Sequence, residues 1–280
     1  MVRSIITLNN TNYLGNNQFS LRLPSVCSFD KDTKISLYSF TMYNSFYNIS
    51  ASQYQNTQIT FTWFDGTVYS WNIPDGYYSI SDLNLWLQQQ FLIYNLYVTN
   101  ATNSQNIFFV SFKTNATLYK NEIDTNYMPS ATNAALFGYS KPTSATWNFP
   151  SINTCVSITI NNNLKSFFGM TNQTSFGIIS PVQNMQYVSQ ICPIVSPVVS
   201  IFISCNLILS KFSQVANIFC QIPINSEYGK LITYNSQIDT GVNVQSGMYN
   251  SINIGLWDQL YQPLQFIDNE LVLMLVIDHD

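Results

Sequence analysis

The sequence predicts an all-β fold, a single jelly-roll β-sandwich that carries a loop insertion and one or two short helices. Apolar and polar residues alternate with a period of two through most of the 280 residues, which is typical of strands that bury one face. Roughly ten such segments occur, and their long connections favour a jelly roll over an immunoglobulin-like sandwich.

A hairpin is the clearest strand signal in the first half of the chain. Ile59, Phe61 and Trp63 alternate with polar residues before a turn. That turn contains Asp65 and Gly66, which tolerate the positive φ of a tight hairpin connection, and the alternation resumes after it. The strands predicted in this half run through residues 19–23, 35–42, 59–63, 69–73 and 107–112.

The second half closes with a strand that is apolar on both faces. Residues 271–277 place leucine and isoleucine on one side and valine and methionine on the other. Such a strand belongs in the middle of a sheet, between two pairing strands and under two covering layers. The strands predicted in this half run through residues 156–160, 199–209, 218–222, 252–256 and 271–277.

Two segments have helical signals. Ser79 or Ser81 can cap a helix with apolar side chains at positions 83, 86, 87 and 91 on one face. Residues 164–169 predict a single helical turn that stops at Gly169.

The alternation is interrupted between residues 120 and 150. This segment holds Pro129, Pro142 and Pro150 among small and polar residues, which is typical of a long loop or a small insertion. No repeat of fixed period occurs, and alternation continues on both sides. We therefore expect one jelly-roll domain over residues 1–280, with a loop insertion at about 120–150.

Charge is scarce. The chain has 10 Lys and Arg and 14 Asp and Glu, so 9% of residues are charged and the formal net charge is −4, against about 25% charged residues in an average soluble domain. The few basic residues are scattered singly, which argues against direct binding of nucleic acid. A deficit of charged residues over the whole chain favours a protein most of whose surface contacts neighbouring protein molecules.

Neither a signal peptide nor a membrane span is expected. The first ten residues lack a sustained apolar segment. Residues 191–209 are apolar, but Pro193, Pro197 and Asn206 interrupt them, so a buried strand is the better interpretation.

The five cysteines do not indicate a disulfide framework or a zinc site. They are odd in number and contain no Cys-x-x-Cys pair. We expect free thiols, no metal and no cofactor. The cysteines are Cys27, Cys155, Cys192, Cys205 and Cys220.

No set of residues predicts catalysis. The one histidine, His279, lies next to the end of the chain, and no glycine-rich phosphate loop occurs. Two acidic pairs, Asp75 with Asp82 and Asp30 with Asp32, are candidates for glycosidase carboxylates, but each fits a turn, a solvated connection or a helix start better. We therefore expect no catalytic, cofactor-binding or metal-binding residues. The many tyrosines and tryptophans fit strands, protein interfaces or a sugar-binding groove.

Several motifs, taken in order, resemble one family of viral proteins. The segments 19–23, 43–49 and 73–84, the last reading Ile-Pro-Asp-Gly-Tyr-Tyr-Ser-Ile-Ser-Asp-Leu-Asn, are similar to the single jelly-roll minor capsid (penton) proteins of virophages and polinton-like viruses. The turn at 164–169 is similar to that family's leucine-glycine-phenylalanine turn, although the order here is Phe-Phe-Gly-Met. The resemblance continues at 203–207 and 256–258 and leaves residues 120–150 and 171–195 unmatched.

The resemblance implies a structural virion protein and not an enzyme. Pentons form homopentamers at the five-fold vertices of an icosahedral capsid, among trimers of a double jelly-roll major capsid protein, and no catalytic residues carry over. The resemblance thus implies a protein of the virion capsid that is assembled inside the host cell, with itself and the major capsid protein as partners. The alternative is a carbohydrate-binding jelly roll, such as a fibre tip or a lectin-like adhesin.

Overall fold

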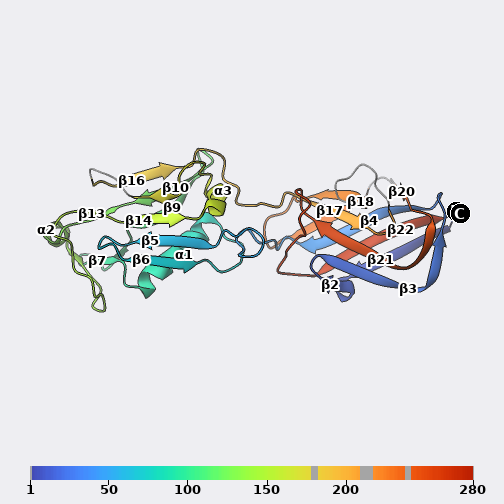
Figure 1. The fold of residues 1–280 in the computed structure, drawn as a ribbon, viewed down its shortest axis with the longest axis horizontal. Coiled ribbons are helices and arrows are strands. Elements are labelled where there is room, and N and C mark those ends of the chain that lie inside the picture. Colours follow the sequence, from blue (N-terminus) through green and yellow to red (C-terminus); the bar gives the residue numbers. More distant parts are fainter. Residues whose placement is uncertain (1, 178–181, 209–216, 237–240, 280) are drawn as a thin grey trace. The chain divides into compact units, whose positions relative to one another are not determined.

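Two separate hydrophobic cores organise this chain in a computed structural model. Figure 1 shows the ribbon of that structure. The structure describes residues 2–177, 182–208, 217–236 and 241–279. The chain divides into two compact units: unit 1 comprises residues 1–47 and 196–280, and unit 2 comprises residues 48–195. Unit 2 is therefore inserted into the sequence of unit 1.

In the part of unit 1 that the structure describes, there are eight long strands and a few short elements. The short elements are a 3-10 turn, Asn10–Asn12, and the strands β2 (Tyr13–Gly15) and β20 (Val242–Asn243). The long strands are β1 (Val2–Asn9), β3 (Gln18–Phe29), β4 (Lys34–Tyr43), β17 (Ser200–Cys205), β18 (Ile218–Pro223), β19 (Leu231–Asn235), β21 (Gly247–Trp257) and β22 (Leu271–His279).

The pairing of these strands is that of a jelly roll. One sheet has the order β1-β22-β4-β19, with β20 also on β4, and the other has the order β18-β17-β21-β3-β2. Among the long strands, the first pairs with the last, the second with the seventh, the third with the sixth and the fourth with the fifth, always antiparallel. This is a long hairpin rolled into a two-sheet sandwich, so the predicted all-β jelly-roll fold is confirmed.

The core of unit 1 lies between the inner faces of its two sheets. Alternate residues of each strand point inward, and Phe40 and Leu273 from one sheet join Ile203 and Leu256 from the other in one buried cluster. β22 lies between β1 and β4, as predicted. Its inner face is fully buried, whereas on the opposite face Val272 is 46% exposed and Val276 only 4%, so the second of the two expected covering layers is present only in part.

Within the described residues, unit 2 combines four sheets with three helices. The two larger sheets have the orders β15-β14-β5-β6 and β16-β10-β9, and the two smaller ones β12-β7-β8 and β11-β13. The elements are β5 (Gln58–Thr62), β6 (Val68–Asn72), α1 (Ile80–Ile93), β7 (Val98–Asn100), β8 (Asn106–Ile107), β9 (Val110–Asn115), β10 (Lys120–Thr125), β11 (Tyr127–Met128), α2 (Ala131–Leu136), β12 (Tyr139–Ser140), β13 (Thr154–Cys155), β14 (Ser157–Ile160), a 3-10 turn (Asn162–Leu164), α3 (Lys165–Phe168), β15 (Ser175–Phe176) and β16 (Met185–Val188).

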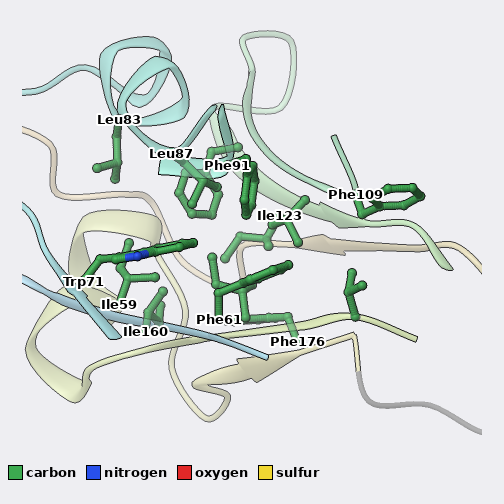
Figure 2. Packing of buried hydrophobic residues seen from close by; sticks show 14 of the residues in the cluster. Ile59, Phe61, Trp71, Leu83, Leu87, Phe91, Phe109, Ile123, Ile160 and Phe176 are labelled. Atoms are coloured by element: carbon green, nitrogen blue, oxygen red, sulfur yellow. The ribbon is translucent and has the colours of Figure 1, made fainter. Parts of the chain in front are cut away.

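Helix α1 supplies one wall of the core of unit 2. Figure 2 shows Leu87 and Phe91 pointing from α1 toward Phe61 of β5. The rings of Phe61 and Phe91 lie edge to face with centroids 4.9 Å apart, and Trp71 of β6 stacks on Phe61 at 5.8 Å. Aromatic pairs of this kind add to the free energy gained by burial. The buried residues of this cluster all lie between Ile49 and Phe176, so unit 2 forms its core without residues of unit 1.

Both helical predictions are confirmed. Ser79 is the N-cap of α1, with its hydroxyl accepting from the Asp82 N–H at 3.1 Å. Gly169 ends α3 with φ of +74°. No helix within the described residues is long and apolar enough to cross a membrane.

The arrangement differs from the sequence prediction in several places. The prediction of one domain over residues 1–280 differs from the two compact units, and residues 120–150 contain β10, β11, α2 and β12 of unit 2. The strand predicted at 199–209 ends at Cys205, and residue 209 lies outside the described residues; the strand at 107–112 is divided between β8 and β9. β1 was not predicted, because its adjacent Ile5 and Ile6 break the alternation.

Candidate functional site

Asp75 and Asp82, one of the two acidic pairs considered for catalysis, are both occupied by local hydrogen bonds. The carboxylate of Asp75 accepts from the Ala51 N–H at 2.8 Å. The carboxylate of Asp82 accepts from the hydroxyl and the N–H of Ser79 at 2.6 and 3.0 Å, and these bonds lower the pKa of Asp82. Burial, followed by the charges of both aspartates, raises the pKa of Tyr78. Both carboxylates thus hold the loop and the helix start around Tyr78.

Asp30 and Asp32 lie in the turn between β3 and β4. One oxygen of Asp30 accepts from the Thr33 hydroxyl at 2.8 Å, the Thr33 N–H at 2.9 Å and the Asp32 N–H at 3.0 Å. The Thr33 hydroxyl is the main cause of the lowered pKa of Asp30. These bonds give Asp30 a structural role in closing the turn.

His279 lies at the end of β22, opposite Val2 of β1. It lines a cavity of about 400 Å³, the flank groove, between the strands at one open side of the jelly roll. Within the described residues, no group of three or more His, Cys, Asp or Glu side chains could hold a metal ion. The groove is lined by Ser4, Ile6, Leu23, Cys27, Ser28, Phe29, Ile277 and His279.

All five cysteines are present as free thiols. Burial raises the pKa of Cys205 to about 12 and that of Cys220 to about 11. Both therefore stay protonated at neutral pH, and a protonated thiol is a poor nucleophile and metal ligand. Cys27 and Cys155 are half-buried and Cys192 is exposed.

The sheet β1-β22-β4-β19 presents an outward surface, called here the first outer face. Three charged side chains lie side by side at one end of this face. Arg3 pairs with Asp278 at 2.8 Å, and Lys34 lies opposite Asp278. The Arg3 hydrogen bond is the main cause of the lowered pKa of Asp278. Ser36 and Val276 occupy outward positions but are buried. The other outward side chains include Arg3, Ile5, Thr7, Asn9, Val272, Met274, Asp278, Lys34, Tyr38, Thr41, Tyr43, Leu231, Thr233 and Asn235.

Apart from Glu270, the rest of the first outer face is uncharged and partly apolar. Ile5 is 62% exposed, Tyr38 55%, Leu231 47% and Val272 46%. Apolar side chains gathered on one surface mark a site of protein contact, because removing them from water is favourable and no charge has to be desolvated. The apolar second side of residues 271–277 was the one sequence signal for this surface.

The opposite sheet has an outward surface of different chemistry, the second outer face. Trp257 donates from its indole N–H to the Ser204 hydroxyl at 2.9 Å, and Phe202 packs against Tyr261 with ring centroids 5.3 Å apart. The outward side chains include Ser20, Arg22, Phe202, Ser204, Gln221, Pro223, Ser251, Asn253 and Trp257, of which Arg22 alone is charged.

A second cavity, of about 340 Å³, opens on the first outer face and is called here the outer cleft. It combines one carboxylate, from Glu270, with the ring of Tyr43 and the aliphatic side chains of Leu231 and Val272. Its lining residues are Asn9, Asn10, Thr41, Met42, Tyr43, Leu231, Glu270, Leu271 and Val272. Sequence reasoning missed this cleft, since strand pairing brings its parts together from four separate segments.

Most tryptophans do not lie in a surface groove. Trp63, Trp71 and Trp147 are buried in the core of unit 2, where they pack against other aromatic rings. Their positions follow from packing, as expected for residues that favour strands.

Comparison with known proteins gives a likeness to solved structures. No family model matches the sequence, and no curated protein matches it. A solved structure, described as the crystal structure of SeMet-labeled mavirus penton protein, is similar with a TM-score of 0.46 and 11% sequence identity, over 99% of this chain and 98% of that chain. The jelly-roll assignment above depends on the order of the strands and not on this likeness.

Proposed function

We propose that this chain is a structural virion protein, a penton that forms homopentamers at the five-fold vertices of an icosahedral capsid of the virophage type. Its partners are further copies of itself and a major capsid protein with a double jelly roll. It acts in the virion capsid and is assembled inside the host cell, without direct contact to nucleic acid.

The observation that carries the proposal is the partly uncovered apolar side of β22, exposed at Val272. This strand is central in its sheet, and one side faces the core while Val272 on the other side is nearly half exposed. A central strand that is apolar on both sides is typical of a sheet covered on both faces. A neighbouring molecule would supply the missing cover.

The two outer faces suit a closed ring. A five-fold ring uses a heterologous contact, in which one surface of each subunit meets a different surface of the next. The two outer faces lie on opposite sides of the sandwich, and of the described side chains on the second face only Arg22 is charged. Nearly uncharged surfaces avoid the large cost of desolvating charges when subunits associate.

A structural role also agrees with the state of the acidic residues. Asp30, Asp75 and Asp82 all accept hydrogen bonds from nearby backbone N–H groups, which stabilise loops. We therefore assign no catalytic, cofactor-binding or metal-binding residue.

The alternative is a carbohydrate-binding jelly roll, and the outer cleft is the observation that favours it. Tyr43 offers a ring for stacking on a sugar, with Asn9, Asn10 and Glu270 as hydrogen-bonding groups. A screen of the purified protein on immobilised neutral glycans tests this function. Specific binding that is lost in Tyr43→Ala would favour it.

The ring is tested by sedimentation of the full chain and of two matched variants. Val272→Asp places a charge on the first outer face, whereas Val68→Asp places one at an exposed position of unit 2 (61% exposed). We expect pentamers for the unchanged chain and for Val68→Asp, and folded monomers for Val272→Asp. Equal assembly of both variants would refute the role of the first outer face.

A further inference from the structure

We infer that the outer cleft is a socket for a second copy of this chain, and that Arg22 of that copy enters it and pairs with Glu270. This inference rests on the proposed ring. It names the residues that fix how one subunit is aligned on the next.

The cleft has the chemistry of a site for a basic side chain. Glu270 supplies a carboxylate, Tyr43 supplies an aromatic ring, and Leu231 and Val272 supply aliphatic walls. A guanidinium group pairs with carboxylates and stacks on aromatic rings, while its alkyl stem packs on apolar surface. No Lys or Arg lines the cleft, and Glu270 forms no ion pair within the described residues.

Most basic residues are already engaged inside their own unit. In unit 2, Lys113 pairs with Asp124, whereas the ammonium groups of Lys120, Lys141 and Lys165 donate to backbone carbonyls of Gln190, Trp147 and Thr171 at 2.8 to 3.0 Å. In unit 1, Arg3 pairs with Asp278, and Lys34 lies beside the same carboxylate.

Arg22 is the basic residue whose position fits the ring. It is exposed on the second outer face and has no ion pair or side-chain hydrogen bond within the described part of the chain. Lys31 lies in the β3–β4 turn and Lys230 in the β18–β19 connection, so neither projects from a strand of that face. Among the described residues, which do not include Lys211, the second outer face thus carries a single unpaired cation, and the cleft on the opposite face carries a single unpaired anion.

The positions of Arg22 and Glu270 along the strand direction are compatible with this pairing. Glu270 is level with Tyr43, about 30 Å from the end of β4 at Lys34, and Arg22 is about 24 Å from the end of β3 at Phe29, at roughly 3.4 Å per residue. Those two strand ends adjoin the same turn. In a ring whose axis runs along the strands, rotation preserves height, and an extended arginine side chain can span the difference.

The Arg22–Glu270 pair would mainly determine how one subunit is aligned on the next. Exposed ion pairs add little affinity, but like charges brought together at an interface are costly. The alignment of the two subunits that pairs opposite charges is therefore favoured over other alignments. Reversing a charge is therefore a sharper test than removing it.

The test uses the full chain with Arg22→Glu, Glu270→Arg and the double variant, measured by sedimentation. Lys31→Glu and Glu227→Arg are controls that reverse charges on exposed residues outside both outer faces. We expect each single variant to raise the concentration for half-assembly by at least about tenfold, and the double variant to restore assembly. The controls should assemble as the unchanged chain does.

Different failures have different meanings. Pentamers that persist unchanged in both single variants would overturn the Arg22–Glu270 pair and leave the proposed ring standing. Weakened single variants without recovery in the double variant would also overturn the pair. An unchanged chain that stays monomeric would overturn the ring and the pair together.

Discussion

Asn48 donates from its side-chain amide to the carbonyl oxygen of Val195 at 2.8 Å, and so joins the first residue of unit 2 to its last. The same amide donates to the Tyr78 carbonyl, and its oxygen accepts from the Tyr78 N–H, both at 2.8 Å. Asn48 is buried, so these bonds are protected from water. The inserted segment is therefore closed at its base by one side chain.

Replacing Asn48 with alanine should destabilise unit 2 by about 2 kcal/mol, because partly buried backbone groups of Tyr78 and Val195 lose their partners. Urea unfolding of the full chain measures this loss. Asn172→Ala, at an exposed position of the same unit, is the control and should change little. Equal stability of the two variants would contradict the closing role of Asn48.

Residues 48–195 should fold when produced alone. Their core is complete within the segment, and their two ends already lie together at Asn48 and Val195. Circular dichroism and thermal unfolding of this fragment should show strand content and one cooperative transition. A fragment without a cooperative transition would instead indicate that unit 2 depends on unit 1.

Gly169 should tolerate substitution less well than Gly66, although both have positive φ (+74° and +88°). A Cβ at residue 169 would lie 2.5 Å from the carbonyl oxygen of Ile191, whereas a Cβ at residue 66 would meet nothing within 4 Å. Gly66→Ala should cost about 1–2 kcal/mol from the left-handed conformation. Gly169→Ala should cost at least about 1 kcal/mol more in urea unfolding. Equal losses would argue against this close approach.

The cap of α1 should make stability depend on pH. The Ser79 hydrogen bonds lower the pKa of Asp82 in the folded chain below its ordinary value of 3.8. The ionised carboxylate therefore stabilises the fold above that pH, and the stabilisation is lost as the pH falls through the lowered pKa. Asp82→Ala should cost about 1 kcal/mol at pH 7 and progressively less below pH 3.8, as measured by urea unfolding. Ser81→Ala is the control. If Asp82→Ala cost the same stability at pH 7 and below pH 3.8, the ionised Asp82 carboxylate would not be the stabilising group of the cap.

Local sequence signals predicted most strands and both helices because these signals act over a few residues. The Asp65-Gly66 turn between β5 and β6 and the Ser79 cap of α1 are of this kind. The boundaries at residues 48 and 195 could not be predicted in this way, since alternation runs through both units alike. Pairing of β1 with β22 brings together opposite ends of the chain, and no local pattern encodes such a contact.

The candidate surface was predictable only in part. The apolar second side of residues 271–277 pointed to a covered surface, but pairing with β1, β4 and β19 decides which side chains share it. The outer cleft depends on the same long-range pairing. Asn48 gave no signal either, because asparagine is common throughout this chain and is usually exposed.

The number of chains in each assembled ring tests the central claim most directly. Electron cryo-microscopy of the purified chain and of the virion, with sedimentation of the same sample, measures it. The account predicts rings with five-fold symmetry, a mass five times the 31.9 kDa of one chain, and the same ring at the capsid vertices. A chain that is monomeric at every concentration and missing from the five-fold vertices would contradict the penton function and favour the carbohydrate-binding alternative.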